Sequence, residues 1–188
     1  KFKNEYWNSF YKNTVNKIDI NHPSQFAIFT LGEARKINTI IEFGCGNGRD
    51  AFFFSNYFKN IYAFDSSKEI INKNNKQYSK IKNLKFLEYD LNNKFEKKNI
   101  LLRKKKAIYA RFFLHALTNN EIKLFISLCA KLLKKKECLF LEYRTEKDKK
   151  GKKVTKNHYR NYIKEKFFND LLKDFNLKNT YFVKGFGY

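Results

Sequence analysis

Long hydrophobic runs and paired cysteines are both missing from this sequence of 188 residues. Nowhere do about 18 uncharged apolar residues follow one another, and the opening segment KFKNEYWNSFYKN lacks the apolar stretch of a secretion signal. Its three cysteines, Cys45, Cys129 and Cys138, form no C-x-x-C pair, which argues against a disulfide framework and against a structural zinc site. We therefore expect a cytoplasmic chain without a membrane span or a bound metal, in which these thiols are buried.

Arginine is scarce although the chain is strongly basic. Only six of the 40 basic residues are arginine, and the formal net charge is +22. A charge of this size raises nucleic acid as a partner. However, lysine, asparagine, isoleucine, phenylalanine and tyrosine abound while proline and glycine are rare, as AT-rich codons would produce. We therefore interpret the lysine runs at 104–106, 134–136 and 147–153 as solvated surface and do not expect a nucleic-acid partner.

Apolar segments rich in β-branched and aromatic residues alternate with longer helical patterns, which is typical of βαβ units around a parallel sheet. The expected strands are 39–43, 61–65, 84–89, 107–111, 138–143 and 180–185. The expected helices are 2–13, 24–36, 48–57, 67–80, 118–134 and 157–175. The pattern predicts a single α/β domain over residues 1–188, with a helical cap at 1–37 and the core at 38–188.

Local sequence features predict where two helices begin and where one loop lies. Ser24 follows the single proline, Pro23, and is expected to cap a helix, because serine is a favoured N-cap residue. Thr118 and Glu121 have the spacing of a capping box. The lysine-rich stretch 146–157 is expected to be a mobile loop.

A glycine-rich turn follows the first expected strand, in the sequence IIEFGCGNGRD at 40–50. A dinucleotide fingerprint G-x-G-x-x-G would need glycine where Arg49 stands, and the G-K-[ST] ending of a phosphate-binding P-loop is absent. The remaining features are three glycines, an acid before them, Glu42, and an acid that ends the next strand, Asp65. The glycines alone are also compatible with an ordinary tight turn.

This pattern resembles motif I and the following acidic position of class I S-adenosylmethionine-dependent methyltransferases. The resemblance implies a Rossmann-like sheet with helices on both faces, S-adenosylmethionine as the methyl donor and S-adenosylhomocysteine as the product. It also implies that Asp65 accepts both ribose hydroxyls and that Asp90 and Leu91, after the third strand, lie at the adenine amino group, although Asp90 could simply cap a turn. The cofactor-binding residues expected on this basis are Glu42, Gly44, Cys45, Gly46, Gly48, Arg49, Asp50, Asp65, Ser66, Asp90, Leu91 and Arg111.

The scarcity of proline narrows the methyl acceptor. Since Pro23 is the only proline, the N-P-P-Y motif of amino-methylating nucleic-acid enzymes and the Pro-Cys pair of cytosine C5 enzymes are both absent. The fourth strand ends in Arg111 rather than aspartate, which disfavours the metal-dependent catechol type. These absences favour oxygen methylation of a small molecule.

Three of the scarce arginines stand where the acceptor is expected. Arg111 and Arg144 end the fourth and fifth strands, and Arg160 begins the last helical pattern. Guanidinium groups bind phosphate or carboxylate through two parallel hydrogen bonds, so we expect an anionic acceptor in a cleft that all three residues face. The alternative is that one or two of them form structural ion pairs with Glu142 or Asp65.

A second resemblance covers most of the chain. The segments YWNSFY (6–11), PSQFA (23–27), YARFFLHAL (109–117) and NHYRNYI (157–163) are similar to bacterial methyltransferases encoded with capsular polysaccharide genes, including those linked to O-methyl phosphoramidate decoration. This resemblance implies a phosphoryl- or sugar-containing acceptor. The family fold ordinarily closes with an antiparallel β-hairpin, and this sequence stops where its last strand is expected to turn back, so we expect the final antiparallel strand to be missing.

The catalytic residues depend on the acceptor. A hydroxyl acceptor needs a base, for which His115 and His158 have a suitable ordinary pKa, whereas an anionic phosphoryl oxygen needs only the arginines. His115 is also compatible with a buried structural role. Trp7, on the first helix, is expected either in the core or over the cofactor. An RNA methyltransferase and a non-catalytic S-adenosylmethionine-binding module remain as alternatives.

Overall fold

The computed structural model describes residues 6–7, 9–10, 12, 22–95, 105–150 and 159–185. Its strands are β1 (Thr39–Phe43), β2 (Asn60–Asp65), β3 (Leu84–Glu88), β4 (Lys106–Arg111) and β5 (Cys138–Glu142). Its α-helices are α2 (Gln25–Glu33), α3 (Arg49–Ser55), α4 (Lys68–Gln77), α5 (Asn119–Leu132) and α6 (Glu165–Asp174), and two short 3-10 helices are η2 (Leu114–Ala116) and η3 (Glu146–Lys150). The five residues described between 6 and 12 are helical, as expected there.

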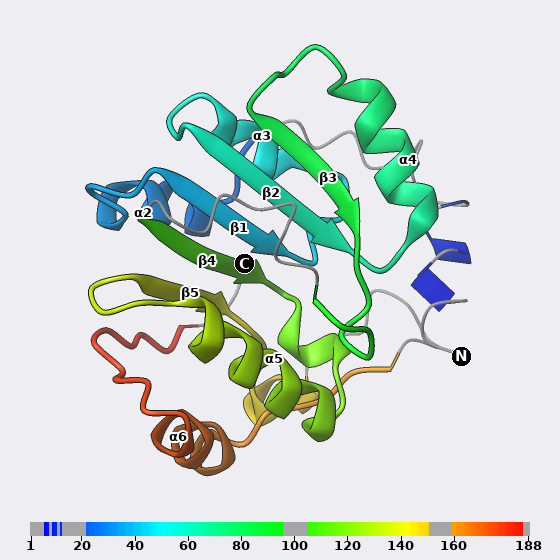
Figure 1. The fold of residues 1–188 in the computed structure, drawn as a ribbon. Helices are drawn as coiled ribbons and strands as arrows, with labels where there is room; N and C mark the ends of the chain where they lie inside the picture. Colours follow the sequence, from blue (N-terminus) through cyan, green and yellow to red (C-terminus); the bar gives the residue numbers. More distant parts are fainter. Residues whose placement is uncertain are drawn as a thin grey trace.

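The five strands form one parallel sheet in the order β3-β2-β1-β4-β5 (Figure 1). β1 is the central strand, and all five of its residues are buried. The chain runs outward from β1 to β3 on one side and from β4 to β5 on the other, so the direction of strand order reverses between β1 and β4. In open α/β sheets, ligands bind beyond the carboxyl ends of the strands at such a reversal.

Helices cover both faces of the sheet, because successive strand residues point to opposite sides. One core joins Ile41 and Phe43 of β1 to the inner faces of α5 and α6, including Phe125 and Phe168. The other joins Ile40 of β1 to α2, α3 and α4. The predicted Rossmann-like α/β fold with helices on both faces is confirmed.

Both predicted helix caps are present. The Ser24 hydroxyl accepts a hydrogen bond from the Ala27 backbone N–H at 3.0 Å and begins α2. The Thr118 hydroxyl accepts from the Glu121 N–H, and the Glu121 carboxylate accepts from the Thr118 N–H at 2.7 Å, which completes the capping box of α5. Within the described ranges, no helix is long and apolar enough to cross a membrane.

Two predicted elements near the C-terminus are wrong. The last helix begins at Glu165 rather than 157, because 159–164 is held in a non-helical path by the Asn161 side chain, which donates to the Leu117 carbonyl oxygen at 3.0 Å. Residues 180–185 form no strand; instead Tyr181 stacks on Phe29 of α2 with ring centroids 5.3 Å apart. Of the predicted loop at 146–157, 146–150 form η3 and the rest lies outside the described residues.

Candidate active site

The glycine-rich turn after β1 needs glycine for steric reasons. Gly44, Gly46 and Gly48 all have positive φ, between 51° and 76°. A Cβ atom on Gly44 would lie 2.7 Å from the Phe113 ring, and one on Gly48 would lie 2.7 Å from the Phe86 ring. Side chains are therefore excluded at both positions by conformation and by contact. The G-x-G-x-G spacing follows from these constraints.

Backbone amides of this turn fix the carboxylate of Asp65 at the end of β2. One carboxylate oxygen accepts from the Gly46 N–H at 3.0 Å, and the other accepts from the Ser67 N–H at 3.0 Å. Burial raises the pKa of Asp65, and hydrogen bonds from the backbone, including those from Ser67 and Gly46, oppose that rise. The carboxylate is thus held at the opening of the turn as a fixed acceptor.

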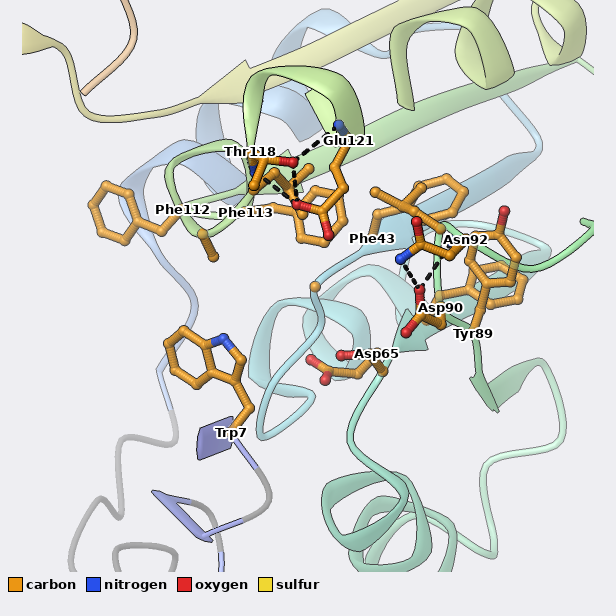
Figure 2. A pocket seen from close by; sticks show the side chains of 16 residues that line it. Trp7, Phe43, Asp65, Tyr89, Asp90, Asn92, Phe112, Phe113, Thr118 and Glu121 are labelled. Carbon is orange, nitrogen blue, oxygen red and sulfur yellow. Dashed lines mark hydrogen bonds between the residues drawn. The ribbon is translucent and has the colours of Figure 1, made fainter. Parts of the chain in front are cut away.

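Asp90 lies after β3 and both caps a turn and faces the site. Its Oδ1 atom accepts from the backbone N–H and the side-chain amide of Asn92, each at 2.9 Å, as the dashed lines of Figure 2 show. Tyr89 and Leu91 on either side of it line the same cavity. The turn-capping alternative is therefore correct for Asp90, but it does not remove Asp90 from the site.

A cavity of about 420 Å³ opens beyond the carboxyl ends of β1, β2 and β4. This volume lies within the usual range for a small-molecule site. In Figure 2, Asp65 and Asp90 lie on one side of the cavity and Thr118 and Glu121 on the other. The lining residues are Trp7, Phe43, Gly44, Phe64, Asp65, Ser66, Tyr89, Asp90, Leu91, Asn92, Phe112, Phe113, Ala116, Leu117, Thr118 and Glu121.

The cavity wall is aromatic and acidic. Its charged groups are the carboxylates of Asp65, Asp90 and Glu121, and no lysine or arginine is among the described residues that line it. Aromatic faces attract cations, and fixed carboxylates accept hydrogen bonds from hydroxyl and amino groups. The cavity is therefore suited to a ligand with a positive centre, a sugar and a flat ring, and is poorly suited to an anion.

Two of the predicted arginines meet on one ring just outside this cavity. The guanidinium carbon of Arg111 lies 4.1 Å from the Phe112 ring centroid, and that of Arg144 lies 5.1 Å from the same centroid. Phe112 itself lines the cavity and has a φ of 54°, in the left-handed region that bulky residues rarely adopt. One side chain thus touches both the cavity and the arginine pair.

Each of these arginines also has a carboxylate partner, which bears out the ion-pair alternative for Arg111. Arg111 Nε lies 2.6 Å from Glu142 Oε2, and Arg144 Nη1 lies 3.5 Å from Asp148 Oδ1. The Arg111 contact engages Nε, and its two Nη atoms have no hydrogen-bond partner within the described ranges. The Nη edge of Arg111 can therefore still bind an anion.

The remaining predicted catalytic residues lie near this pair or outside the described ranges. His115 is buried in η2, with its ring centroid 5.7 Å from that of Phe112. Arg160 is half-buried beside Asn161, whose backbone N–H donates to the His115 carbonyl oxygen at 2.7 Å. His158 lies outside the described residues. The structure thus brings Arg111, Arg144 and His115 around Phe112 and docks the segment that carries Arg160 onto η2.

Several of the predicted cofactor residues do not line the cavity. Those that line it are Gly44, Asp65, Ser66, Asp90 and Leu91, and those that do not are Glu42, Cys45, Gly46, Gly48, Arg49, Asp50 and Arg111. Glu42 and Cys45 are buried, and burial raises the pKa of both side chains well above their ordinary values. Asp50 and Asp65 raise the pKa of Glu42 further. Glu42 is therefore a group that this environment favours in its neutral form.

Asp50 has a structural role behind the turn. Its carboxylate accepts hydrogen bonds from the Ser24 N–H, the Ser24 hydroxyl and the Tyr109 hydroxyl, each at 2.8 Å. It also lies 3.7 Å from Arg49 Nε. These contacts tie the start of α2 to α3 and β4 directly beneath the glycine-rich turn.

The sequence did not identify most of the cavity's aromatic wall. Trp7 was assigned either to the core or to the cofactor, and it lines the cavity. Phe112 and Phe113 directly follow the strand that was predicted at 107–111. Their position at a strand end is the sequence feature from which a place in the site could have been predicted. Thr118 and Glu121 were predicted only as a helix cap, and the same two side chains also face the cavity.

Comparison with known proteins identifies the family. The methyltransferase domain family matches residues 40–136, more than half of the chain, and the chain belongs to this family. No curated protein sequence matches the chain. The family match and the sheet order confirm the predicted methyltransferase fold.

Solved structures with low sequence identity share the fold. Phosphoethanolamine N-methyltransferase 1 from Haemonchus contortus, in complex with phosphoethanolamine and S-adenosylhomocysteine, has a TM-score of 0.71 at 12% identity over 92% of this chain. This chain covers 40% of that enzyme's chain. Magnesium protoporphyrin IX methyltransferase from Synechocystis PCC 6803 with bound S-adenosylhomocysteine has a TM-score of 0.66 at 16% identity, covering 92% of this chain and 86% of that one. The PH0226 protein from Pyrococcus horikoshii OT3 has a TM-score of 0.69 at 15% identity, covering 88% of each chain.

Proposed function

We propose that this protein transfers the methyl group of S-adenosylmethionine to an oxygen of a small anionic acceptor that contains a phosphoryl or sugar group. The observation that carries the proposal is the shared position of Phe112, which lines the cavity and stacks with Arg111 and Arg144. The acidic, aromatic cavity suits the sulfonium, ribose and adenine of the cofactor. The adjacent arginine pair suits a phosphate or carboxylate, which the cavity wall itself would repel.

Each group in the cavity takes a role in cofactor binding. Asp65 accepts the ribose hydroxyls, since its carboxylate is already fixed by two backbone amides. Asp90 and Leu91 hold the adenine at the end of β3, and the aromatic wall that includes Trp7 and Tyr89 excludes water from the methyl group. These assignments leave the opening beside Phe112 for the acceptor.

The reaction is an in-line displacement at the methyl carbon. When bound, S-adenosylmethionine would supply the methyl group, and the acceptor oxygen would bond to its carbon as the S–C bond breaks and S-adenosylhomocysteine is released. A phosphoryl oxygen is already an anion, so no base is required. The guanidinium groups of Arg111 and Arg144 orient it and balance its charge, and Arg160 joins them from the docked segment.

Two further observations support the acceptor class. The Haemonchus enzyme, which has the same fold, was solved with phosphoethanolamine, a phosphate-bearing small molecule. The sequence segments at 6–11, 23–27, 109–117 and 157–163 resemble capsular polysaccharide methyltransferases, including those of O-methyl phosphoramidate decoration. We therefore place the reaction in the biosynthesis of a capsular polysaccharide or its methyl phosphoramidate group, in the cytoplasm.

The test compares arginine and histidine variants with capsule precursors as acceptors and mass spectrometry as the assay. We expect Arg111→Lys, Arg144→Lys and Arg160→Lys each to lower kcat/KM by about 10- to 100-fold, because lysine keeps the charge and loses the two-pronged contact. His115→Gln and His158→Gln should cost less than about tenfold. Arg35→Lys is the control, since Arg35 lies two residues after the end of α2 and its Nε–H donates to the Gly32 carbonyl oxygen.

The opposite ranking would contradict the phosphoryl acceptor. If a histidine variant loses about 10²- to 10⁴-fold and activity falls below pH 6.5, a general base is at work and a hydroxyl is the acceptor. The net charge of +22 keeps RNA methylation as a second candidate. Tight RNA binding at physiological salt, measured by gel shift, would favour it.

A further inference from the structure

The end of β4 has an unusual backbone. Phe112 directly follows Arg111, the last residue of β4, with a φ of 54°, and its N–H donates to the Glu142 carbonyl oxygen of β5 at 2.8 Å. This bond continues the β4–β5 pairing by one residue while the chain turns. Phe112 is among the residues that line the cavity, and Figure 2 labels it on the same side as Thr118.

The Phe112 ring contacts the flexible side chains of both Arg111 and Arg144. Arginine side chains have many rotamers, and binding an anion with a free arginine costs the entropy of fixing it. Arg111 and Arg144 are each held between the Phe112 ring and a carboxylate, Glu142 or Asp148. Guanidinium groups within about 6 Å of an aromatic centroid are attracted to its face, so the ring restricts both of them.

We propose that Phe112 is a positioning residue for the acceptor, which holds the guanidinium groups of Arg111 and Arg144 at a fixed place relative to the cofactor cavity. The inference rests on the proposed function, since it assigns the two arginines to an anionic acceptor. Phe112 acts through the arginines, and its aromatic face rather than its apolar volume is the property that matters. Leucine at this position keeps the apolar wall and removes the aromatic face.

The experiment compares Phe112→Leu with Phe112→Tyr, which retains the aromatic face, and with Phe113→Leu as a matched control. Phe113 lines the same cavity and packs on Gly44. Three quantities are measured: the affinity for S-adenosylhomocysteine by calorimetry, the affinity of the S-adenosylhomocysteine-saturated protein for inorganic phosphate, and the side-chain Nε–H resonances of Arg111 and Arg144 by NMR. Protons above an aromatic ring are shifted by its ring current, so these resonances report the stacking directly.

We expect Phe112→Leu to weaken phosphate binding by about tenfold and to shift both arginine resonances, with S-adenosylhomocysteine affinity changed by less than about threefold. Phe112→Tyr should match the wild type in all three measurements, and Phe113→Leu should leave the arginine resonances in place. Unchanged resonances or unchanged phosphate affinity in Phe112→Leu would overturn the role of Phe112 alone. A wild-type protein that binds no phosphate would overturn the anionic acceptor, and with it the acceptor role of Phe112.

Discussion

The carboxylates of the site are held mainly by the backbone, whereas its guanidinium groups are held by side chains. In the carboxylate half, made of the glycine-rich turn, Asp65 and Asp90, N–H groups of Gly46, Ser67 and Asn92 fix the two acids. In the arginine half, made of Arg111, Phe112 and Arg144, the fixed points are one ring and two carboxylates. Geometry set by the backbone depends little on which side chains surround it. Geometry set by side chains changes with a single substitution.

The two halves therefore differ in how function can vary between related proteins. A fold that keeps the turn and the strand ends keeps the carboxylate half. The arginine half involves only the last residues of β4 and β5 and the residues that follow them, so its side chains can be exchanged with little change to the rest of the sheet. Solved proteins with this fold at 12% to 16% identity include methyltransferases named for phosphoethanolamine and for magnesium protoporphyrin IX.

We expect the largest difference between the carboxylate half and the arginine half in the effect of Asp65→Ala on cofactor affinity. Loss of a charged partner for two hydroxyl groups costs about 1.5–3 kcal/mol, so the affinity for S-adenosylmethionine should fall about 10- to 100-fold. Calorimetry measures this change. Asp148→Ala is the matched control in the arginine half, because it removes the carboxylate beside Arg144. It should leave the affinity for S-adenosylmethionine unchanged. Equal losses in both variants would show that the halves are not separate.

A smaller effect is expected on stability from Gly48→Ala. Gly48 has a φ of 76°, and an added Cβ would lie 2.7 Å from the Phe86 ring, so we expect a loss of about 1–3 kcal/mol in the free energy of unfolding. Thermal unfolding measures it as a lower Tm. Gly32→Ala is the control, because Gly32 lies within α2 with no atom within 4 Å of its added Cβ, and alanine there should stabilise the helix by about 0.5–1 kcal/mol. A neutral Gly48→Ala would remove the steric explanation of the turn.

The smallest effect is a pH dependence of stability that arises at Glu42 in β1. Burial, followed by the charges of Asp50 and Asp65, raises the pKa of Glu42 well above its ordinary value of 4.5. The folded state therefore binds the proton of the Glu42 carboxyl group more tightly than the unfolded state does. The stability that this proton contributes is complete at low pH and is lost as the pH rises above about 4.5 toward the pKa of Glu42 in the folded state.

Glu42→Gln tests this contribution because glutamine stays neutral. We expect its Tm to exceed that of the wild type by about 2–4 °C at pH 8, with no difference at pH 4. Glu142→Gln is the contrasting variant, since Glu142 pairs with Arg111 and its replacement removes an attractive partner. It should not raise the Tm at pH 8. A Glu42→Gln protein that is less stable at pH 8 would show that the negative charge of Glu42 stabilises the fold.

The sequence predicted the carboxylate half better than the arginine half, for the same physical reason. Gly44, Asp65 and Asp90 occupy strand ends and a turn, and backbone geometry alone brings those positions together. The stacking of Arg111 and Arg144 depends on the left-handed conformation of Phe112, which no pattern in the sequence specifies. The three arginines were expected in one cleft, and the described contacts bring two of them onto one ring.

The C-terminal errors have a related cause. Residues 180–185 have the composition of a strand but do not form one, and Tyr181 instead stacks on Phe29 of α2. The helical pattern from 157 was interrupted by Asn161, whose side chain bonds both the Leu117 carbonyl oxygen and Asn119 Oδ1. Such long-range contacts override local propensity.

The hydrogen bonds of Asp50 determine where the chain can be shortened. A deletion that begins the protein at residue 38 would remove both donors of Ser24 and leave a buried carboxylate with the Tyr109 hydroxyl as its remaining described hydrogen-bond donor. That carboxylate stands in the first turn of α3, directly after the glycine-rich turn. The second helix of the predicted cap therefore belongs to the smallest unit in which the Asp50 carboxylate keeps its partners, and a shortened protein must begin before Ser24.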